Sequence, residues 1–441
     1  METKEEIRAR FAPSPTGKVH IGNIRAAIYN WLFARHTGGK FLLRVEDTDL
    51  ERSTPEAIEA LFECMKWLGL DWDEEVFYQT KNIQRHLECV EKLLSSGRAY
   101  KIEKTSRDGK TGIVTMFRMP KEGTIEFDDI VKGHMAKKAE DIQDFAIVRS
   151  DGSPIFHIAN VVDDIDQRVT HIIRGDDHVE NTFKHIEIFK ALGAPVPRYA
   201  HLSMIVNRQG KPYSKRDGAA FVGEYRDAGY LPDALFNYLL LLGWNPGGDR
   251  EVISRDEAAK LFDLEKVHVT AAMFDPKKLQ WMNGEYIKRM PAAAFKEEVK
   301  KAAAGYGEAN HTEEWWDSLS SQLQTRTKFL KDLHESVRPF FDGEYPFDQA
   351  AVEKRLAKPG VKELLLDLAA RFESAPDWNA PALEAIVKEL SQGGGMGPWV
   401  HPVRVATSGR GEGIGLFEML ELLGRDATLR RMRDAASKYA L

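Results

Sequence analysis

The chain is poor in cysteine. Its 441 residues include only two cysteines, Cys64 and Cys89, and both lie in sequence of helical character. Two thiols cannot build a disulfide framework, and they cannot supply the cysteine-rich ligand set of a structural zinc ion. We therefore expect a reducing, cytoplasmic setting for the protein.

Long apolar runs are also lacking. Charged residues occupy the first positions of the chain, where a signal peptide needs an apolar stretch. The longest apolar stretches, such as residues 238–242, are far too short to cross a bilayer. This pattern predicts a protein that makes no contact with a membrane.

Neither sign of charge dominates the composition. The chain has 62 Lys and Arg against 68 Asp and Glu, a net charge of −6. Such a balance gives no overall attraction for nucleic acid, so any RNA binding depends on local basic patches. The length and the hydrophobic content of 43% are enough for several cores, and we expect roughly two to four domains.

The first hundred residues alternate strand and helix signals. Residues 7–12 are short and partly apolar, and residues 21–34 have apolar side chains at helical spacing. Residues 40–45 form an apolar run of strand length, and Ser53-Thr54-Pro55-Glu56 has the cap and first-turn residues of a further helix. This order predicts an α/β fold with a parallel sheet.

Later segments change character. Glycines punctuate short strand-like pieces from about residue 100 to residue 151, as expected of an insertion carried on the main sheet. Apolar strand signals resume at residues 154–162 and 169–174. From Leu231 onward the pattern is mostly helical.

A loop between the first strand and the first helix has the features of an anion site. A rigid proline-rich loop leads into a helix whose first turn carries His20 and Gly22. Free backbone amides and the helix dipole favour an anion there, and Gly22 lets a nucleotide approach the backbone. His20 offers a donor for a phosphate oxygen. These features predict a nucleotide site at a sheet edge, although an isolated His-x-Gly pair is more often a simple helix start.

The same stretch resembles the HIGH signature of class I aminoacyl-tRNA synthetases. The lead-in at residues 12–17, Ala-Pro-Ser-Pro-Thr-Gly, is similar to that of the glutamyl branch specifically. The fourth position of the signature is Asn23 rather than histidine. The resemblance implies a catalytic role for His20 and an ATP-binding role for the residues Thr16, Gly17, His20 and Gly22.

A second signature lies in the polar, cation-rich loop of residues 207–218. Taken alone, this loop fits a solvated charged turn. It is similar, however, to the KMSKS loop of the same class, with matches at Ser214, Lys215 and Arg216, which the resemblance assigns to ATP binding. A flexible ammonium can follow the charge that builds on a departing pyrophosphate, so Lys215 is the second catalytic candidate. Pro212 stands where the family motif begins with lysine.

The resemblance also implies a glutamate pocket. Glutamate has two carboxylates and one ammonium, so its site needs cations and a carboxylate. Positions that line the glutamate site in the glutamyl family carry the expected residue types here, namely Arg10, Ser14, Glu46, Asn160 and Arg174. Glu46 would hold the α-ammonium and Arg174 the side-chain carboxylate. Phe156 belongs to the same substrate-binding set, but the family usually has tyrosine at its position.

The resemblance extends over nearly the whole chain and implies its domains. It predicts a Rossmann-type parallel-sheet catalytic domain with an inserted α+β subdomain, followed by an all-helical anticodon-binding region. The segments are residues 1–100 and 154–205 for the two catalytic halves, 101–153 for the acceptor-binding insertion, 206–300 for the lysine loop and stem-contact domain, and 301–441 for the anticodon-binding domain. Candidate RNA contacts in the last segment are Arg404, Arg410, Arg430, Arg431 and Arg433.

The implied activity is a ligase reaction. L-glutamate would be activated by ATP with Mg²⁺ and transferred to the 3′-terminal ribose of tRNA(Glu), by a monomeric enzyme that charges tRNA(Glu) alone or also tRNA(Gln). No zinc is expected, because the insertion has no cysteine. Two alternatives stay open: a glutaminyl-tRNA synthetase, which Arg174 disfavours, and a tRNA-binding paralogue without catalysis, which the departures at Asn23, Pro212 and Phe156 motivate.

Overall fold

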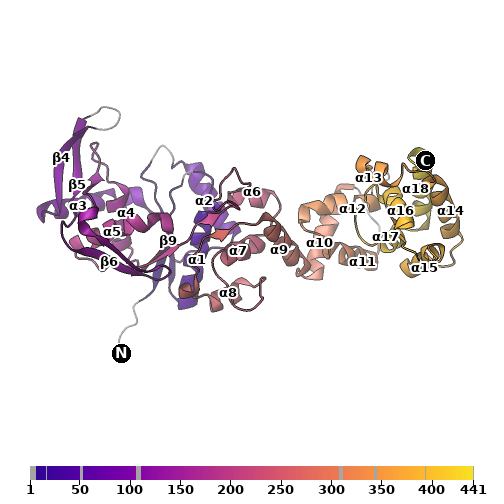
Figure 1. The fold of residues 1–441 in the computed structure, drawn as a ribbon, viewed down its shortest axis with the longest axis horizontal. Coiled ribbons are helices and arrows are strands. Elements are labelled where there is room, and N and C mark those ends of the chain that lie inside the picture. Colours follow the sequence, from indigo (N-terminus) through magenta and orange to yellow (C-terminus); the bar gives the residue numbers. More distant parts are fainter. Residues whose placement is uncertain are drawn as a thin grey trace. The chain divides into compact units, whose positions relative to one another are not determined.

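The computed structural model describes residues 6–15, 17–49, 53–105, 111–306, 311–341, 345–392 and 394–440. The chain forms two compact units, Met1–Leu279 and Gln280–Leu441 (Figure 1).

A seven-stranded sheet is the centre of the first unit. Its strand order is β3-β2-β1-β9-β10-β6-β7. The strands are β1 (Arg8–Phe11), β2 (Lys40–Val45), β3 (Phe77–Tyr78), β6 (Thr124–Asp129), β7 (Gly133–Lys138), β9 (His171–Gly175) and β10 (Arg198–Leu202). Neighbouring strands are parallel from β3 through β6, and β7 joins as an antiparallel edge. The predicted α/β parallel sheet is therefore confirmed.

Two helices that pack near the sheet form where the sequence predicts them, α1 (Ile21–Thr37) and α2 (Pro55–Trp67). The chain also forms α3 (Ile83–Ser95), α4 (Phe156–Asp166) and α5 (Val179–Ala191) in this unit. Thr54 caps α2 by accepting a hydrogen bond from the Ala57 amide, and Pro55 occupies the first turn. α1 ends at Gly38, whose φ of 68° lies in the left-handed region. α1 packs against β1, β2 and β9, so its N-terminus is held at one edge of the sheet.

One predicted strand is wrong. Residues 154–162 were expected to form a strand, but Phe156 to Asp166 form the helix α4. The β-branched residues in this stretch favour a strand locally. Ile158, Val161 and Val162 nevertheless follow helical spacing, and all three are buried in the core. The segment forms a helix and not a strand because the helix buries these apolar side chains in the core.

The predicted short strands of the insertion are confirmed. β4 (Ala99–Thr105), β5 (Thr111–Phe117) and β8 (Phe145–Val148) form an antiparallel sheet, whereas β6 and β7 extend the main sheet. β6 pairs with β10 through Tyr199 and Asp129. The insertion therefore contributes strands to the sheet that carries the site.

The chain is mostly helical after Leu231, as predicted. The first unit continues with β11 (Ile205–Val206), α6 (Val222–Asp227), α7 (Pro232–Leu241), α8 (Arg255–Leu261) and β12 (Ala272–Met273), and α9 (Pro276–Lys288) crosses into the second. The second unit continues with α10 (Ala292–Ala303), α11 (Glu313–Gln324), α12 (Leu333–Phe341), α13 (Gln349–Arg355), α14 (Val361–Glu373), α15 (Ala380–Leu390), α16 (Gly397–Ser408), α17 (Leu416–Leu423) and α18 (Arg425–Lys438). No helix within the described ranges combines the length and the apolar character that a bilayer crossing requires.

Candidate active site

A cavity of about 710 Å³ opens at the carboxyl-terminal edge of the sheet. Ligands of open α/β sheets bind at this edge, where the segments that follow parallel strands meet. The cavity brings together most of the residues predicted from the sequence: Arg10, Ser14, His20, Gly22, Glu46, Phe156, Asn160 and Arg174. Gly17, Ser214, Lys215 and Arg216 are not part of its lining, and Thr16 lies outside the described residues.

His20 is the N-cap of α1. Its Nδ1 accepts a hydrogen bond of 3.0 Å from the Gly22 amide, so the proton of the neutral ring resides on Nε2. Burial lowers the pKa of His20, and a hydrogen bond with the Tyr213 main chain opposes this effect. A Cβ at position 22 would lie 3.2 Å from His20 Nδ1. A side chain at this position would therefore make a tight contact with the capping ring, which glycine avoids.

The lysine loop is organised by two residues that the sequence did not single out. The Asp217 carboxylate accepts hydrogen bonds from the amide and hydroxyl of Ser214, at 2.9 and 3.0 Å. Asn207 Nδ2 donates to Asp217 at 2.8 Å. These donors, Asn207 first, lower the pKa of Asp217. The loop thus has a fixed base, and Lys215 and Arg216 are exposed at its tip.

Phe221 contacts both predicted catalytic residues, His20 and Lys215. Lys215 Nζ lies 4.8 Å from the centre of the Phe221 ring, and the His20 ring contacts the same phenyl group edge-on at 5.8 Å. The Ile21 amide also donates to the Ala220 carbonyl at 3.0 Å. Segments far apart in sequence therefore place both predicted catalytic residues on one aromatic ring.

A buried network of charges lies under the amino-acid end of the cavity. Asp164 accepts hydrogen bonds from Arg10 Nε at 3.0 Å and from an Arg44 terminal nitrogen at 2.6 Å. Arg44 also pairs with Glu46 at 3.2 Å, and Asn160 Nδ2 donates to Glu46 at 2.6 Å. The network contains two arginines and two carboxylates, so its charges balance.

Burial and pairing act against each other in this network. Burial raises the pKa of Glu46, while Arg44 and Arg10 act to lower it. Burial also acts to raise the pKa of Asp164, but Arg10 and Arg44 outweigh it and lower the value. Arg44 and Asp164 were missed from the sequence, and the only available signal was that Arg44 precedes Glu46 by two residues and shares its strand face.

Arg174 lies beside this network without an ionic partner. Its Nε is 3.3 Å from His201 Nε2, and a terminal nitrogen is 2.7 Å from Thr182 Oγ1. In the described part of the chain no carboxylate oxygen lies within 4.0 Å of its guanidinium nitrogens, and the residue as a whole is 8% exposed. Burial lowers the pKa of Arg174 to about 10, so the group stays charged at neutral pH. A buried, unpaired cation favours an anionic ligand.

Comparison with known proteins identifies the family of the chain. The family model described as tRNA synthetases class I (E and Q), catalytic domain, matches residues 6–110 and 102–281. A model described as anticodon binding domain matches residues 285–436. A glutamate–tRNA ligase from Trichlorobacter lovleyi is 39% identical, and the match covers 98% of each chain. The chain belongs to the glutamate–tRNA ligase family of class I tRNA synthetases.

Solved structures of this family have the same fold. A glutamate tRNA ligase from Elizabethkingia meningosepticum, in complex with its amino acid, has a TM-score of 0.86 at 29% identity and covers 99% of this chain and 100% of its own. A glutamate–tRNA synthetase from Elizabethkingia anophelis has a TM-score of 0.84 at 29% identity, covering 98% of this chain and 100% of its own. The predicted family and the order of its two regions are confirmed.

The departures from the family pattern also lie at the first cavity. Asn23, Pro212 and Phe156 all line it. Phe156 begins α4, and its ring lies 5.9 Å from that of His178.

Among the described segments, no three or more His, Cys, Asp or Glu side chains lie together in a group that could hold a metal ion.

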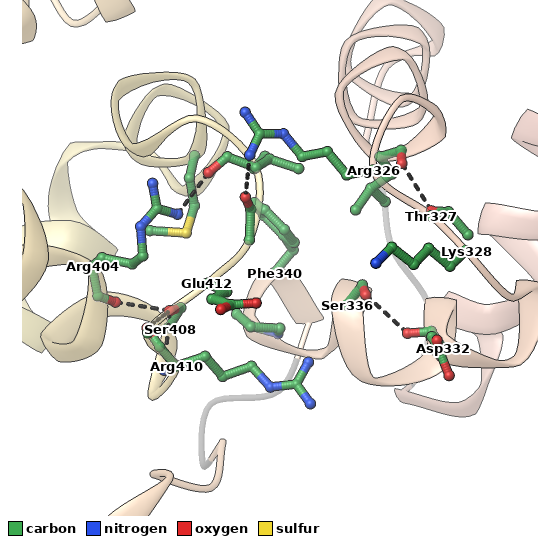
Figure 2. Close-up of a pocket in the computed structure, with 16 residues that line it drawn as sticks. Arg326, Thr327, Lys328, Asp332, Ser336, Phe340, Arg404, Ser408, Arg410 and Glu412 are labelled. Atoms are coloured by element: carbon green, nitrogen blue, oxygen red, sulfur yellow. Dashed lines mark hydrogen bonds between the residues drawn. The ribbon is translucent and has the colours of Figure 1, made fainter. Parts of the chain in front are cut away.

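A second cavity, of about 580 Å³, lies in the second unit, inside the region matched by the anticodon-binding model (Figure 2). Figure 2 shows Arg326 and Lys328 on one wall and Arg404 and Arg410 on the opposite wall. Arg326 donates to the Gly413 carbonyl at 2.9 Å, and Arg404 donates to the Ile414 carbonyl at 2.6 Å. These bonds hold the loop between α16 and α17 against a cation-rich wall.

The other arginines considered for RNA contact are placed differently. Arg431 is buried, lies 4.3 Å from the Tyr345 ring centre and donates to the Thr407 carbonyl, so its role is in packing. Arg433 forms an ion pair of 2.6 Å with Glu373, and Arg430 is exposed. Only Arg404 and Arg410 of the predicted group line the second cavity.

Proposed function

We propose that the protein activates L-glutamate with Mg-ATP and attaches it to the 3′-terminal ribose of tRNA(Glu). The observation that carries this proposal is the buried Arg174 beside a balanced charge network. The α-ammonium and α-carboxylate of an amino acid cancel each other's charge. The side-chain carboxylate of glutamate supplies the additional anion that Arg174 lacks, whereas the neutral amide of glutamine does not.

The cavity residues take separate roles in this proposal. Glu46 pairs with the α-ammonium, and Arg10, Ser14, Asn160 and Phe156 complete the amino-acid site. ATP binds at the start of α1 and under the lysine loop, through Thr16, Gly17, His20, Gly22, Ser214, Lys215 and Arg216. The α1 N-terminus and the Nε2–H of His20 supply donors for phosphate oxygens. Mg²⁺ enters bound to the phosphate oxygens of its nucleotide substrate.

Two displacements complete the reaction. The glutamate α-carboxylate attacks the α-phosphorus of ATP, forming a phosphorus–oxygen bond while pyrophosphate leaves. A terminal ribose hydroxyl of tRNA then attacks the acyl carbon, and AMP leaves. No side chain forms a covalent intermediate, so positioning and charge stabilisation supply the rate. The cation-π contact with Phe221 holds Lys215 beside His20 before the substrate arrives.

The tRNA is the second macromolecular substrate. We propose that the anticodon loop binds at the second cavity, where Arg326, Arg404 and Arg410 offer donors to phosphates and bases. Residues 101–153 and 206–300 contact the acceptor end and the stem, and residues 301–441 carry the anticodon contacts. The proposed enzyme is a cytoplasmic monomer without structural zinc.

The test is ATP–pyrophosphate exchange by the full chain with purified tRNA(Glu). Exchange that depends on glutamate and is not driven by glutamine is the expected result. Exchange driven by glutamine instead would identify a glutaminyl-tRNA synthetase. ATP binding without exchange for either amino acid would identify a tRNA-binding paralogue that has lost catalysis.

A further inference from the structure

We propose that Asp129, at the end of β6, positions Arg174 for its carboxylate ligand by fixing the tautomer of His201. The inference rests on the proposed function, in which Arg174 receives the side-chain carboxylate of glutamate. Asp129 does not line the cavity, so it is a positioning residue and not a catalytic one.

Two buried side chains, His201 and Thr182, connect Asp129 to Arg174. Asp129 Oδ2 lies 2.6 Å from His201 Nδ1, and His201 Nε2 lies 3.3 Å from Arg174 Nε. Thr182 Oγ1 is 3.0 Å from His201 Nε2 and 2.7 Å from a terminal nitrogen of Arg174. Asp129 is 3% exposed, and His201 and Thr182 are fully buried. Water therefore cannot replace a contact that is lost in this chain of hydrogen bonds.

The partners of His201 allow only one arrangement of its protons. A carboxylate only accepts hydrogen bonds, so Nδ1 must carry a proton toward Asp129. The guanidinium Nε only donates, so Nε2 must present a lone pair to Arg174. The neutral ring with its proton on Nδ1 meets both conditions. Burial lowers the pKa of His201, which keeps the ring neutral, although Asp129 opposes the effect.

The Asp129 carboxylate is itself held in one orientation by the backbone. Its Oδ1 accepts hydrogen bonds from the amides of Val131 and Lys132, at 3.0 and 2.8 Å. Asparagine at this position would keep its carbonyl oxygen toward these two donors. Its NH₂ group would then face His201 Nδ1, which could only accept, and the ring proton would move to Nε2. An N–H would then oppose the Arg174 Nε–H.

This arrangement gives the insertion a role in amino-acid binding. Asp129 lies in the inserted segment and pairs with β10 at Tyr199, two residues before His201 in the chain. The side chain that selects the γ-carboxylate is therefore held in place by a strand from outside the two catalytic halves. We expect amino-acid affinity to depend on this strand pairing.

The test compares Asp129→Asn with Asp128→Asn in the full chain. Asp128 is the neighbouring residue on the same strand, its side chain is 89% exposed, and it does not line the cavity. In tRNA-dependent exchange, Asp129→Asn should raise the KM for glutamate about tenfold or more while the KM for ATP stays within about twofold. Asp128→Asn should change neither. An unchanged glutamate KM in Asp129→Asn, or an equal rise in both KM values, would overturn the inference.

A pair of variants at His201 gives a second test that does not depend on the folding of Asp129→Asn. His201→Gln places an amide oxygen where it accepts from Arg174, and should hold the glutamate KM within about threefold of wild type. His201→Leu removes the acceptor and should raise it about tenfold or more. Equal glutamate KM values for the two variants would contradict the inference.

The wild-type measurement separates the two proposals. Glutamate-dependent exchange by wild type, with no selective effect of Asp129→Asn or His201→Leu, would overturn the positioning role alone. Absence of glutamate-dependent exchange in wild type would overturn the proposed function, and the inference with it. Unfolding midpoints of all variants, followed by circular dichroism, show whether each protein assayed is folded.

Discussion

The surroundings of single side chains set the charges that the proposed chemistry uses. His20 is kept neutral by burial, so it offers a donor without adding a full charge. Lys215 remains exposed on an aromatic face and keeps a mobile ammonium near the start of α1. Arg174, unlike the exposed Lys215, is buried and is fixed by hydrogen bonds to neutral partners. In the proposed mechanism, His20 accordingly donates to phosphate, Lys215 is a mobile cation for pyrophosphate, and Arg174 is a rigid ligand of a carboxylate.

Lys215→Ala should lower the rate of ATP–pyrophosphate exchange about a hundredfold or more, because the departing pyrophosphate loses its mobile cation. The unfolding midpoint should stay unchanged, since the side chain is exposed. Lys266→Ala is a matched control, because that lysine is 70% exposed and pairs only with Asp263 among the ion pairs of the described residues. Near-normal exchange by the Lys215 variant would refute the role assigned to it.

Phe156→Tyr should strengthen glutamate binding. The phenol hydroxyl would supply a hydrogen bond at a position where the family usually has tyrosine, and a net bond of this kind lowers KM about twofold to tenfold. Steady-state exchange at varied glutamate concentrations measures the effect. Phe62→Tyr, at a half-buried ring near Trp72, controls for a general effect of the added hydroxyl. A raised glutamate KM in Phe156→Tyr would show that the cavity has no room for this group.

The helix α4 shows where sequence patterns stop being informative. Its β-branched residues predicted a strand, and the helix forms because its apolar face is buried. The helical spacing then places Phe156, Asn160 and Asp164 on one side, four residues apart. Asp164 meets Arg10 and Arg44 from strands more than a hundred residues away in the chain. No local pattern predicts such pairs, so Asp164 and Arg44 could not be identified before the fold was known.

Asp164→Asn should destabilise the first unit by about 3 kcal/mol, because two buried arginines lose their shared counter-charge. Urea unfolding followed by tryptophan fluorescence measures the loss. Asp166→Asn, two residues further along α4, removes a carboxylate whose contacts with Arg85 and Asn82 are near the surface, and should cost less than about 1 kcal/mol. Equal losses in the two variants would contradict the importance of the buried network.

At the scale of the whole molecule, local order was predictable and long-range pairing was not. The order β1, α1, β2, α2 along the chain could be predicted from apolar spacing, helix caps and chain breaks, because these signals act within a few residues. The pairing of β6 with β10 joins the insertion to the main sheet, and it depends on contacts between distant segments. For this reason His201 and Asp129 were not recognised from the sequence, whereas Arg174 and Glu46 were recognised by resemblance.

Stability of the first unit should fall as the pH drops from about 6.5 to about 4. Burial, with a smaller effect of Arg198, lowers the pKa of His171 to about 4, and burial lowers that of His157 to about 4. Histidines of the unfolded chain titrate near pH 6.5, so in this window the unfolded state binds more protons. Their stabilising contribution is complete above about pH 6.5 and is lost on acidification.

Urea unfolding at pH 7.5 and pH 5 measures this dependence. His171→Gln removes one of the titrating groups, so the variant should lose less free energy of unfolding between the two pH values than wild type. The difference should approach about 1.4 kcal/mol per pH unit within the window. Identical losses in variant and wild type would show that His171 is accessible to protons in the folded protein.

Selection of glutamate by a buried, unpaired arginine is the central claim, and amino-acid attachment to tRNA tests it most directly. Labelled glutamate and labelled glutamine are each incubated with the protein, Mg-ATP and purified tRNA(Glu) or tRNA(Gln). The account predicts that glutamate is attached to tRNA(Glu) and that glutamine is attached to neither tRNA, while any glutamate on tRNA(Gln) reports relaxed tRNA choice. Attachment of glutamine at a comparable rate, or no attachment of glutamate to either tRNA, would contradict it.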